Sequence, residues 1–248
     1  MKNRKTFSKK TFLHKNMARK TITLKTIVIA SAAIILGSIQ SAQAHTSFVI
    51  TDSSNAFAGK SYFATLNLGH GCEDVLSGVK FDTEKLEVDI PAGVTSIRPM
   101  DSAWATATVV KDVDGNITQL VWTRTNAPLA EDSQLYRVSF TAKLPDAPMT
   151  TLAFPARQIC HNTNAVEITT PWEGAEAPTL KLLPPRAPGW NKYTAQADID
   201  DTTINAFFSD AYIVWSGSAA YSANPVTAGL ITNTLTIIPA GADFWVKY

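Results

Sequence analysis

The chain has 248 residues, a formal net charge of +1, 45% hydrophobic residues and two cysteines. This composition excludes an intrinsically disordered chain, a collagen-like chain and a small scaffold held by many disulfides. The near-neutral total hides two unlike parts, because residues 1–44 hold nine of the 22 Lys and Arg residues and no Asp or Glu. The remaining 204 residues carry 13 basic and 21 acidic side chains, a net charge of −8. Since so acidic a body is a poor binder of phosphate backbones, we expect no nucleic-acid partner.

The basic first part is typical of an export signal. Lysines and arginines crowd the first 25 residues, an apolar run follows over 26–36, and Ala42-Gln43-Ala44 supplies the small residues that a signal peptidase accepts. The run is short for a membrane span, so we predict a signal peptide over 1–44, with an uncleaved anchor as the alternative. Translation from Met17 would give a leader of ordinary length. The mature protein is therefore expected in the periplasm.

Cleavage after Ala44 would make His45 the first mature residue. A free amino-terminal histidine offers its α-amine and its imidazole Nδ1 to one metal ion, and nitrogen ligands of this kind favour Cu(II). The α-amine titrates at about 8, so such a site is usable at neutral pH. Asp52, seven residues later, and Glu167 are the carboxylates that could complete it. The alternative is that a histidine follows the cleavage site by chance.

Most of the body alternates apolar and polar residues with a period of two, as half-buried strands do. The run Tyr136–Lys143 alternates cleanly, and the run Ser61–Leu68 does so except at Phe63. Asp114-Gly115-Asn116 predicts a hairpin between strands at 106–110 and 117–122. Further short strands are predicted at 46–50, 75–81, 85–90, 94–98, 151–155, 165–169 and 179–183. Because no long helical period appears, the sequence predicts an all-β, immunoglobulin-like antiparallel β-sandwich over 45–184.

The two cysteines, Cys72 and Cys160, both lie in the part expected to be exported. An oxidising compartment allows them to form a disulfide. The alternative, a thiolate metal site or a reactive thiol, is less favoured because no CxxC pattern is present.

A proline-rich break at 184–189 separates the predicted sandwich from a smaller C-terminal extension over 190–248. Strands are predicted there at 211–215, 234–238 and 243–247. The extension holds ten aromatic residues, which could form a small core or pack on the sandwich. The alternative is a surface that binds a partner or a membrane without any metal.

Familiar catalytic signatures are absent from the sequence, which contains no GxSxG, HExxH, P-loop or GxGxxG motif. We therefore expect a protein that is not an enzyme. In Gly69-His70-Gly71-Cys72 the histidine could be a ligand, but we favour glycines placed there because the chain turns sharply.

Several short motifs carry a family resemblance together with the predicted start at His45. They are Ala58-Gly59, Gly69-His70-Gly71-Cys72, Ile90-Pro91-Ala92-Gly93-Val94 with Arg98-Pro99-Met100, Val121-Trp122, Leu144-Pro145-Asp146-Ala147-Pro148, and Phe154-Pro155 with Gln158-Ile159-Cys160. In this order and spacing the chain resembles, over about 45–183, the YcnI-like copper-binding domain family, formerly a domain of unknown function. Its tail resembles an extension of some members, through 220–225 and 245–248.

The resemblance implies a β-sandwich that binds Cu(II) through the amine and ring of one amino-terminal histidine, aided by a carboxylate and a nearby tryptophan. The histidine corresponds to His45, and the carboxylate matches Asp52 by spacing, with one methylene fewer than the family's glutamate. The tryptophan position falls on Glu167, which could be a replacement oxygen ligand. Trp172 could instead supply the tryptophan, and His70 is a second candidate neighbour of the metal that does not bind it.

The sequence thus predicts a periplasmic copper chaperone or homeostasis protein, whose partner would be another periplasmic or membrane copper-handling protein. One alternative is a histidine-brace copper oxidase that acts on polysaccharide. Such an enzyme needs a second histidine ligand, for which only His70 and His161 are available. The other alternative is the non-metal interaction module suggested by the aromatic tail.

Overall fold

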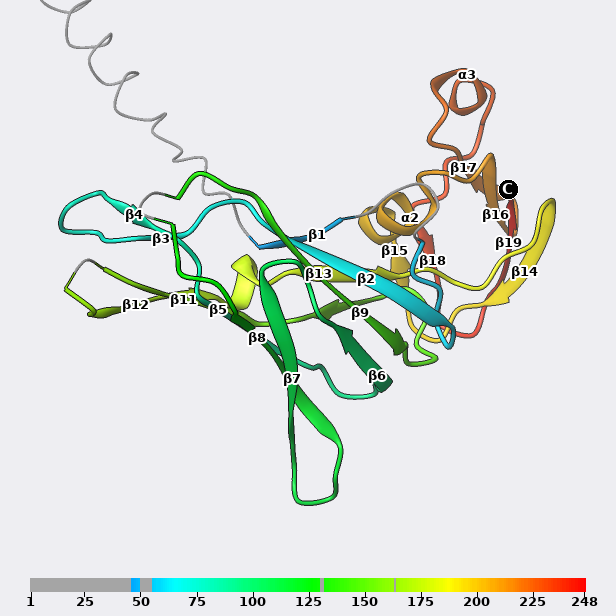
Figure 1. The fold of residues 1–248 in the computed structure, drawn as a ribbon. Coiled ribbons are helices and arrows are strands. Elements are labelled where there is room, and N and C mark those ends of the chain that lie inside the picture. The colour runs from blue at the N-terminus through cyan, green and yellow to red at the C-terminus, as the bar shows by residue number, and fades with distance from the viewer. Residues whose placement is uncertain (1–45, 50–54, 130–131, 163) are drawn as a thin grey trace, which may run out of the picture. The chain divides into compact units, whose positions relative to one another are not determined.

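Figure 1 shows the fold in the computed structural model, which describes residues 46–49, 55–129, 132–162 and 164–248. The predicted signal peptide and the predicted ligands His45 and Asp52 lie outside the described residues. Within the described ranges, no helix is both long and apolar enough to cross a membrane.

The first main sheet is antiparallel and has four strands in the order β1-β2-β9-β6. The strands are β1 (Ser47–Phe48), β2 (Ser61–Leu68), β9 (Tyr136–Lys143) and β6 (Thr95–Met100). Burial alternates along β2 and β9 as the sequence predicted, and Phe63, which broke the pattern, is 52% exposed on the outer face.

The second main sheet is antiparallel and has five strands in the order β12-β11-β5-β8-β7. The strands are β12 (Glu167–Trp172), β11 (Ala156–His161), β5 (Lys85–Asp89), β8 (Ile117–Arg124) and β7 (Ala105–Lys111). The predicted hairpin joins β7 to β8, and its turn is held by the Asp112 carboxylate, which accepts the backbone N–H groups of Asp114 and Asn116.

The core lies between these two sheets. Residues of both contribute to one buried cluster, in which Trp122, Phe140, Phe154 and Leu66 are among the largest fully buried side chains. Two aligned sheets that bury their apolar faces against each other form a sandwich. The prediction of an all-β, immunoglobulin-like antiparallel sandwich is confirmed.

Smaller elements complete this part of the chain. They are the pair β10 (Thr150–Ala153) with β13 (Thr179–Leu182), the pair β3 (Cys72–Glu73) with β4 (Lys80–Phe81), and the short helix η1 (Gly174–Glu176). The single strand predicted at 75–81 is wrong, because the chain turns between β3 and β4, with Gly78 at φ +69°. β11 was not predicted, because the buried position of Gln158 interrupts its apolar alternation.

Residues 190–248 form a second buried cluster. Their main sheet has the order β14-β19-β16-β17, with β14 (Trp190–Thr194), β19 (Asp243–Lys247), β16 (Ile213–Ser216) and β17 (Ala219–Tyr221). The other elements are β15 (Ile199–Asp200) paired with β18 (Ile237–Ile238), and the helices α2 (Asp201–Phe208) and α3 (Pro225–Ala228). The strand predicted at 234–238 is reduced to the two residues of β18.

The sequence did not predict α2. Its start is capped by the Asp200 carboxylate, which accepts the N–H of Thr203 at 2.7 Å. It buries Ile204, Phe207 and Phe208, so these aromatics of the extension form a core of their own. Met149 and Leu183 of the sandwich pack against that core.

Candidate functional site

The residues that follow His45 are held firmly in the fold. Thr46, the first described residue, is only 2% exposed, and β1 pairs with β2 through Ser47 opposite Asn67. The Phe48 ring packs edge-on against Phe154, with centroids 5.0 Å apart. The Thr46 hydroxyl is buried and has no hydrogen-bond partner among the described residues. The chain is therefore anchored one residue after the proposed ligand.

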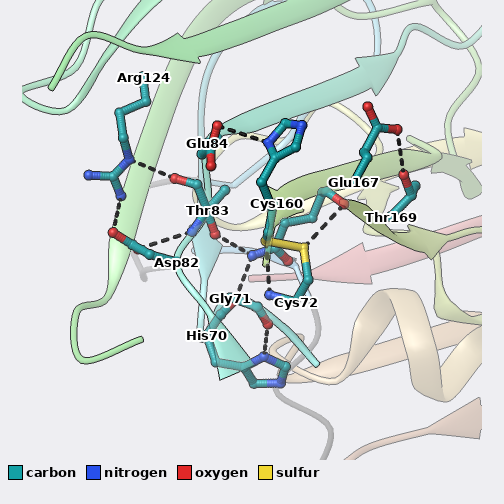
Figure 2. Close-up of a disulfide and its surroundings, with 12 residues drawn as sticks. His70, Gly71, Cys72, Asp82, Thr83, Glu84, Arg124, Cys160, Glu167 and Thr169 are labelled. Carbon is teal, nitrogen blue, oxygen red and sulfur yellow. Dashed lines mark hydrogen bonds and ion pairs between the residues drawn. A yellow bond between two sulfur atoms is a disulfide. The ribbon is translucent and has the colours of Figure 1, made fainter. Parts of the chain in front are cut away.

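A disulfide closes the region that follows β2. Cys72 and Cys160 are both fully buried and bonded, with Cα atoms 5.9 Å apart, and the Cys72 N–H points to Cys160 Sγ at 3.0 Å (Figure 2). The predicted pairing is confirmed. Since Cys72 lies in β3 and Cys160 in β11, this bond links the two-stranded pair β3-β4 to the five-stranded sheet.

The glycines beside His70 have a steric reason. The chain bends at His70, and a Cβ on Gly71 would lie 1.7 Å from the main-chain oxygen of Phe81, so no side chain fits there. The His70 Nδ1 lies 2.5 Å from the Gly71 carbonyl oxygen. Close approach of two backbone segments, and not a turn alone, explains the motif.

A buried polar network lies next to the disulfide, and the sequence analysis missed it. Gln158, 1% exposed, donates from Nε2 to the His70 carbonyl at 2.6 Å and to Thr83 Oγ1 at 2.5 Å. Asp82 and Arg124 form an ion pair at 2.7 Å, and Arg124 Nε donates to the Thr83 carbonyl at 2.7 Å (Figure 2). The sequence did contain a signal for Arg124. Every second residue of β8 points inward, so Arg124 follows Leu120 and Trp122 on the buried side.

The Arg124 guanidinium also lies against aromatic rings, 4.8 Å from the Tyr136 centroid and 5.5 Å from that of Trp104. Burial raises the pKa of the Tyr136 hydroxyl, and the positive charge of the nearby Arg124 guanidinium opposes this rise. The Asp82 side chain is fully buried and that of Arg124 is 7% exposed, so solvent screens this pair only weakly.

Glu167 lies on the outer face of the five-stranded sheet. It begins β12 opposite His161, and its Oε1 lies 3.2 Å from Thr169 Oγ1. The Nδ1 of His161 lies 3.0 Å from Glu84 Oε2, and these three side chains line a cavity of about 250 Å³. Figure 2 shows His70 and Glu167 pointing away from each other on either side of the disulfide. Among the described residues, no three His, Cys, Asp or Glu side chains are arranged to hold a metal ion.

Trp172 is 3% exposed and belongs to the sandwich core. It ends the strand that Glu167 begins, so the two are separated by about 17 Å and lie on opposite faces of the sheet. The structure therefore does not bring these two predicted residues together.

The sandwich matches one family. The family model "Domain of unknown function (DUF1775)" matches residues 48–182, more than half of the chain. The chain belongs to the DUF1775 family. This is the family that the YcnI-like resemblance suggested, so that prediction is confirmed.

The similarity of this chain to solved structures is weak. An uncharacterized protein from Nocardia farcinica, described as having an immunoglobulin-like fold, is 23% identical with a TM-score of 0.43, over 56% of this chain and 97% of that one. Domains D2 and D3 of the major pilin SpaD from Corynebacterium diphtheriae are 17% identical with a TM-score of 0.32, over 51% of this chain and 49% of that one. A cohesin module of a Clostridium perfringens family 33 glycoside hydrolase is 11% identical with a TM-score of 0.31, over 56% of this chain and 96% of that one. No curated protein matches the chain.

The DUF1775 match covers the disulfide, the Asp82–Arg124 pair and Glu167. It ends at the last residue of β13, so the second core and its sheet lie beyond it. Family membership therefore bears on the sandwich, and the extension needs an argument of its own.

Proposed function

We propose that the mature protein is exported to the periplasm and binds one Cu(II) ion through the α-amine and imidazole of His45. We further propose that it carries or buffers copper, exchanging it with another periplasmic or membrane copper-handling protein, and that it catalyses no reaction. Membership of the DUF1775 family and the Ala44–His45 junction support this proposal. The buried disulfide supports export, because such bonds persist in oxidising compartments.

The observation that carries the proposal is the anchoring of the chain directly after His45. Thr46 is buried, and Phe48 is packed in β1 against Phe154. A terminus cut one residue before such an anchor has little backbone freedom left to lose when both its nitrogens bind a metal. Preorganisation of this kind strengthens binding, because the ordering cost has already been met during folding.

The proposed oxygen ligand is Asp52, and Glu167 is the alternative. β1 belongs to the sheet that packs on the inner side of the five-stranded sheet, whereas Glu167 lies on the outer side with His161. An ion held at the start of β1 would therefore favour a carboxylate other than Glu167. A carboxylate suits the site because it offsets the charge of the cation.

The decisive experiment is a Cu(II) titration of protein that begins at His45, as verified by intact mass. We expect one tightly bound Cu(II) per chain. One added glycine before His45, or His45→Ala, should weaken binding at least about 100-fold, because the glycine separates the α-amine from the His45 ring and the alanine removes the imidazole. His70→Ala and His161→Ala are matched controls that remove the other mature histidines and should leave the affinity and the electron paramagnetic resonance spectrum unchanged.

Unchanged affinity after the added glycine would refute the amino-terminal site. Loss of one imidazole signal in His70→Ala or His161→Ala would instead favour the two-histidine oxidase geometry. Comparison of Asp52→Asn with Glu167→Gln assigns the carboxylate, since only the ligand's variant should alter the spectrum.

A further inference from the structure

Three tryptophans lie half-exposed on one face of the extension's sheet. Trp190, Trp215 and Trp245 are 50%, 48% and 45% exposed. Strand alternation turns Phe244 and Val246, the neighbours of Trp245 on β19, into the second core, where both are fully buried. The three indoles therefore occupy positions that the core does not use.

The strand register places the three indoles side by side. Trp215 on β16 lies directly opposite Trp245 on β19, and Trp190 on β14 lies opposite Lys247, two residues along from Trp245. Directly opposite side chains have Cβ atoms about 5 Å apart, and diagonal ones about 7–8 Å apart. The three indoles thus lie on the same face of three neighbouring strands, and all three line one hollow.

This surface is held in place by local contacts. The Trp215 Nε1–H donates to the Gly217 carbonyl at 2.7 Å, which fixes the orientation of that ring. The Lys192 Nζ lies 5.9 Å from the Trp245 ring centroid. Rings fixed on a sheet lose little side-chain entropy when a ligand stacks on them.

The indoles border a hollow that also contains a charged group. The hollow has a volume of about 440 Å³ and is lined by Trp190, Trp215, Gly217, Asp243 and Trp245. The Asp243 carboxylate accepts Thr194 Oγ1 at 2.7 Å and pairs with Lys192 Nζ at 2.5 Å. These contacts, that of Lys192 first, lower the pKa of Asp243, so it remains a charged hydrogen-bond acceptor.

Aromatic faces combined with hydrogen-bonding groups match the chemistry of sugars. A pyranose ring presents C–H groups on its faces and hydroxyls around its rim. The C–H groups are attracted to the negative face of an indole, and a carboxylate and an ammonium can bond the hydroxyls. We propose that the outer face of β14, β19 and β16 binds a polysaccharide of pyranose rings, stacked on the three tryptophans and hydrogen-bonded to Asp243 and Lys192.

The same observations disfavour a membrane. Insertion into lipid requires a contiguous apolar surface, whereas here Asp243 lines the same hollow as the three rings and would be desolvated. A second copy of the chain is disfavoured as well. A two-fold contact centred on this hollow would bring the two Asp243 carboxylates together.

The test is co-sedimentation of the mature protein, with and without a chelator, with insoluble cellulose, chitin and purified peptidoglycan. A soluble oligomer of whichever polymer binds then gives the dissociation constant by calorimetry. We expect binding that is independent of copper. Trp245→Ala should weaken it at least about tenfold, and the double variant Trp190→Ala/Trp245→Ala should abolish it.

Two further variants separate the chemistry from general surface effects. Asp243→Asn keeps the shape but loses the charged acceptor, and it should weaken binding several-fold. Phe63→Ala is the matched control. Phe63 is a 52% exposed aromatic residue on β2 of the sandwich, so its replacement should not change the affinity for the polysaccharide. Circular dichroism and thermal unfolding verify that each variant is folded.

The proposal is overturned if none of the three polymers binds, or if Phe63→Ala weakens binding as much as Trp245→Ala does. It is also overturned if Trp245→Ala instead abolishes binding to phosphatidylglycerol–phosphatidylethanolamine vesicles, or abolishes a dimer seen by sedimentation. Because the assay runs without copper, its failure leaves the His45 proposal untouched.

Discussion

The buried pair Asp82–Arg124 gives a stability prediction whose size follows from the structure. The Asp82 side chain is 0% exposed, that of Arg124 is 7% exposed, and their charged atoms are 2.7 Å apart. Charge centres about 4 Å apart attract by about 4 kcal/mol at an effective dielectric constant of about 20. Removal of one partner from a buried pair costs about 3–5 kcal/mol, because the other charge is left without compensation.

The perturbation is a double-mutant cycle with Asp82→Asn and Arg124→Met. Asparagine keeps an acceptor for the Thr83 N–H, and methionine keeps apolar contact with Tyr136. Arg124→Met also removes the hydrogen bond from Nε to the Thr83 carbonyl, a loss that the cycle cancels because the double variant shares it. Each single variant should lower the free energy of unfolding by about 3–5 kcal/mol, and the double variant by much less than their sum. The interaction energy should therefore be about 3 kcal/mol or more.

The assay is urea unfolding at pH 7 monitored by circular dichroism, with the exposed pair Lys192–Asp243 as the control cycle. Its side chains are 50% and 49% exposed, so its interaction energy should not exceed about 1 kcal/mol. An Asp82–Arg124 value as small as that of the control would refute the argument that burial makes this pair matter.

Three further predictions concern the anchor, the disulfide and a surface ion pair. Phe48→Ala should weaken Cu(II) binding by about tenfold without removing a ligand, because the terminus regains freedom; unchanged affinity in the titration would contradict the anchoring argument. Replacement of Cys72 and Cys160 by serine should cost up to about 4–5 kcal/mol for an 88-residue separation, measured by urea unfolding with and without reductant on the native chain. Arg157→Gln should cost about 1 kcal/mol at pH 7. The pKa of Glu87 lies below its usual 4.5, because burial raises it but its basic partners, Arg157 first, lower it more. The Arg157→Gln cost should therefore be full above pH 4.5 and vanish as pH falls through the native pKa; a cost that persists in acid would exclude this origin.

Alternation of apolar and polar residues was enough to predict the strands that border the core. β2 and β9 bury every second side chain, as their sequences suggest, and the turn at Asp112 closes the predicted hairpin. The prediction failed where tertiary contacts replace apolar burial. Gln158 occupies an inward position of β11 because Thr83 and a backbone carbonyl satisfy its amide, which no local pattern reveals.

Short elements were missed for a different reason. Helix α2 has eight residues, too few to be stable alone or to show a clear period, so its formation depends on packing. In hindsight the local signal was the cap at Asp200 followed by Ile204, Phe207 and Phe208 on one face. The candidate copper ligand, by contrast, depends on where a peptidase cuts, and the fold contributes only the anchor at Thr46.

In the strands of the extension, side chains alternate between the buried core and the exposed face, and this alternation distinguishes residues that stabilise the fold from residues that do not. Along β19, Phe244 and Val246 are buried, so their burial stabilises the second core. Trp245 lies between them, leaves 45% of its surface exposed and makes a smaller contribution to folding for its size. Trp215 and Trp190, on the two flanking strands, share this outward side. Polar residues at these three positions would leave the second core intact, and exposed aromatics grouped in this way mark binding surfaces. The extension should therefore stay folded when these tryptophans are replaced, and lose its ligand.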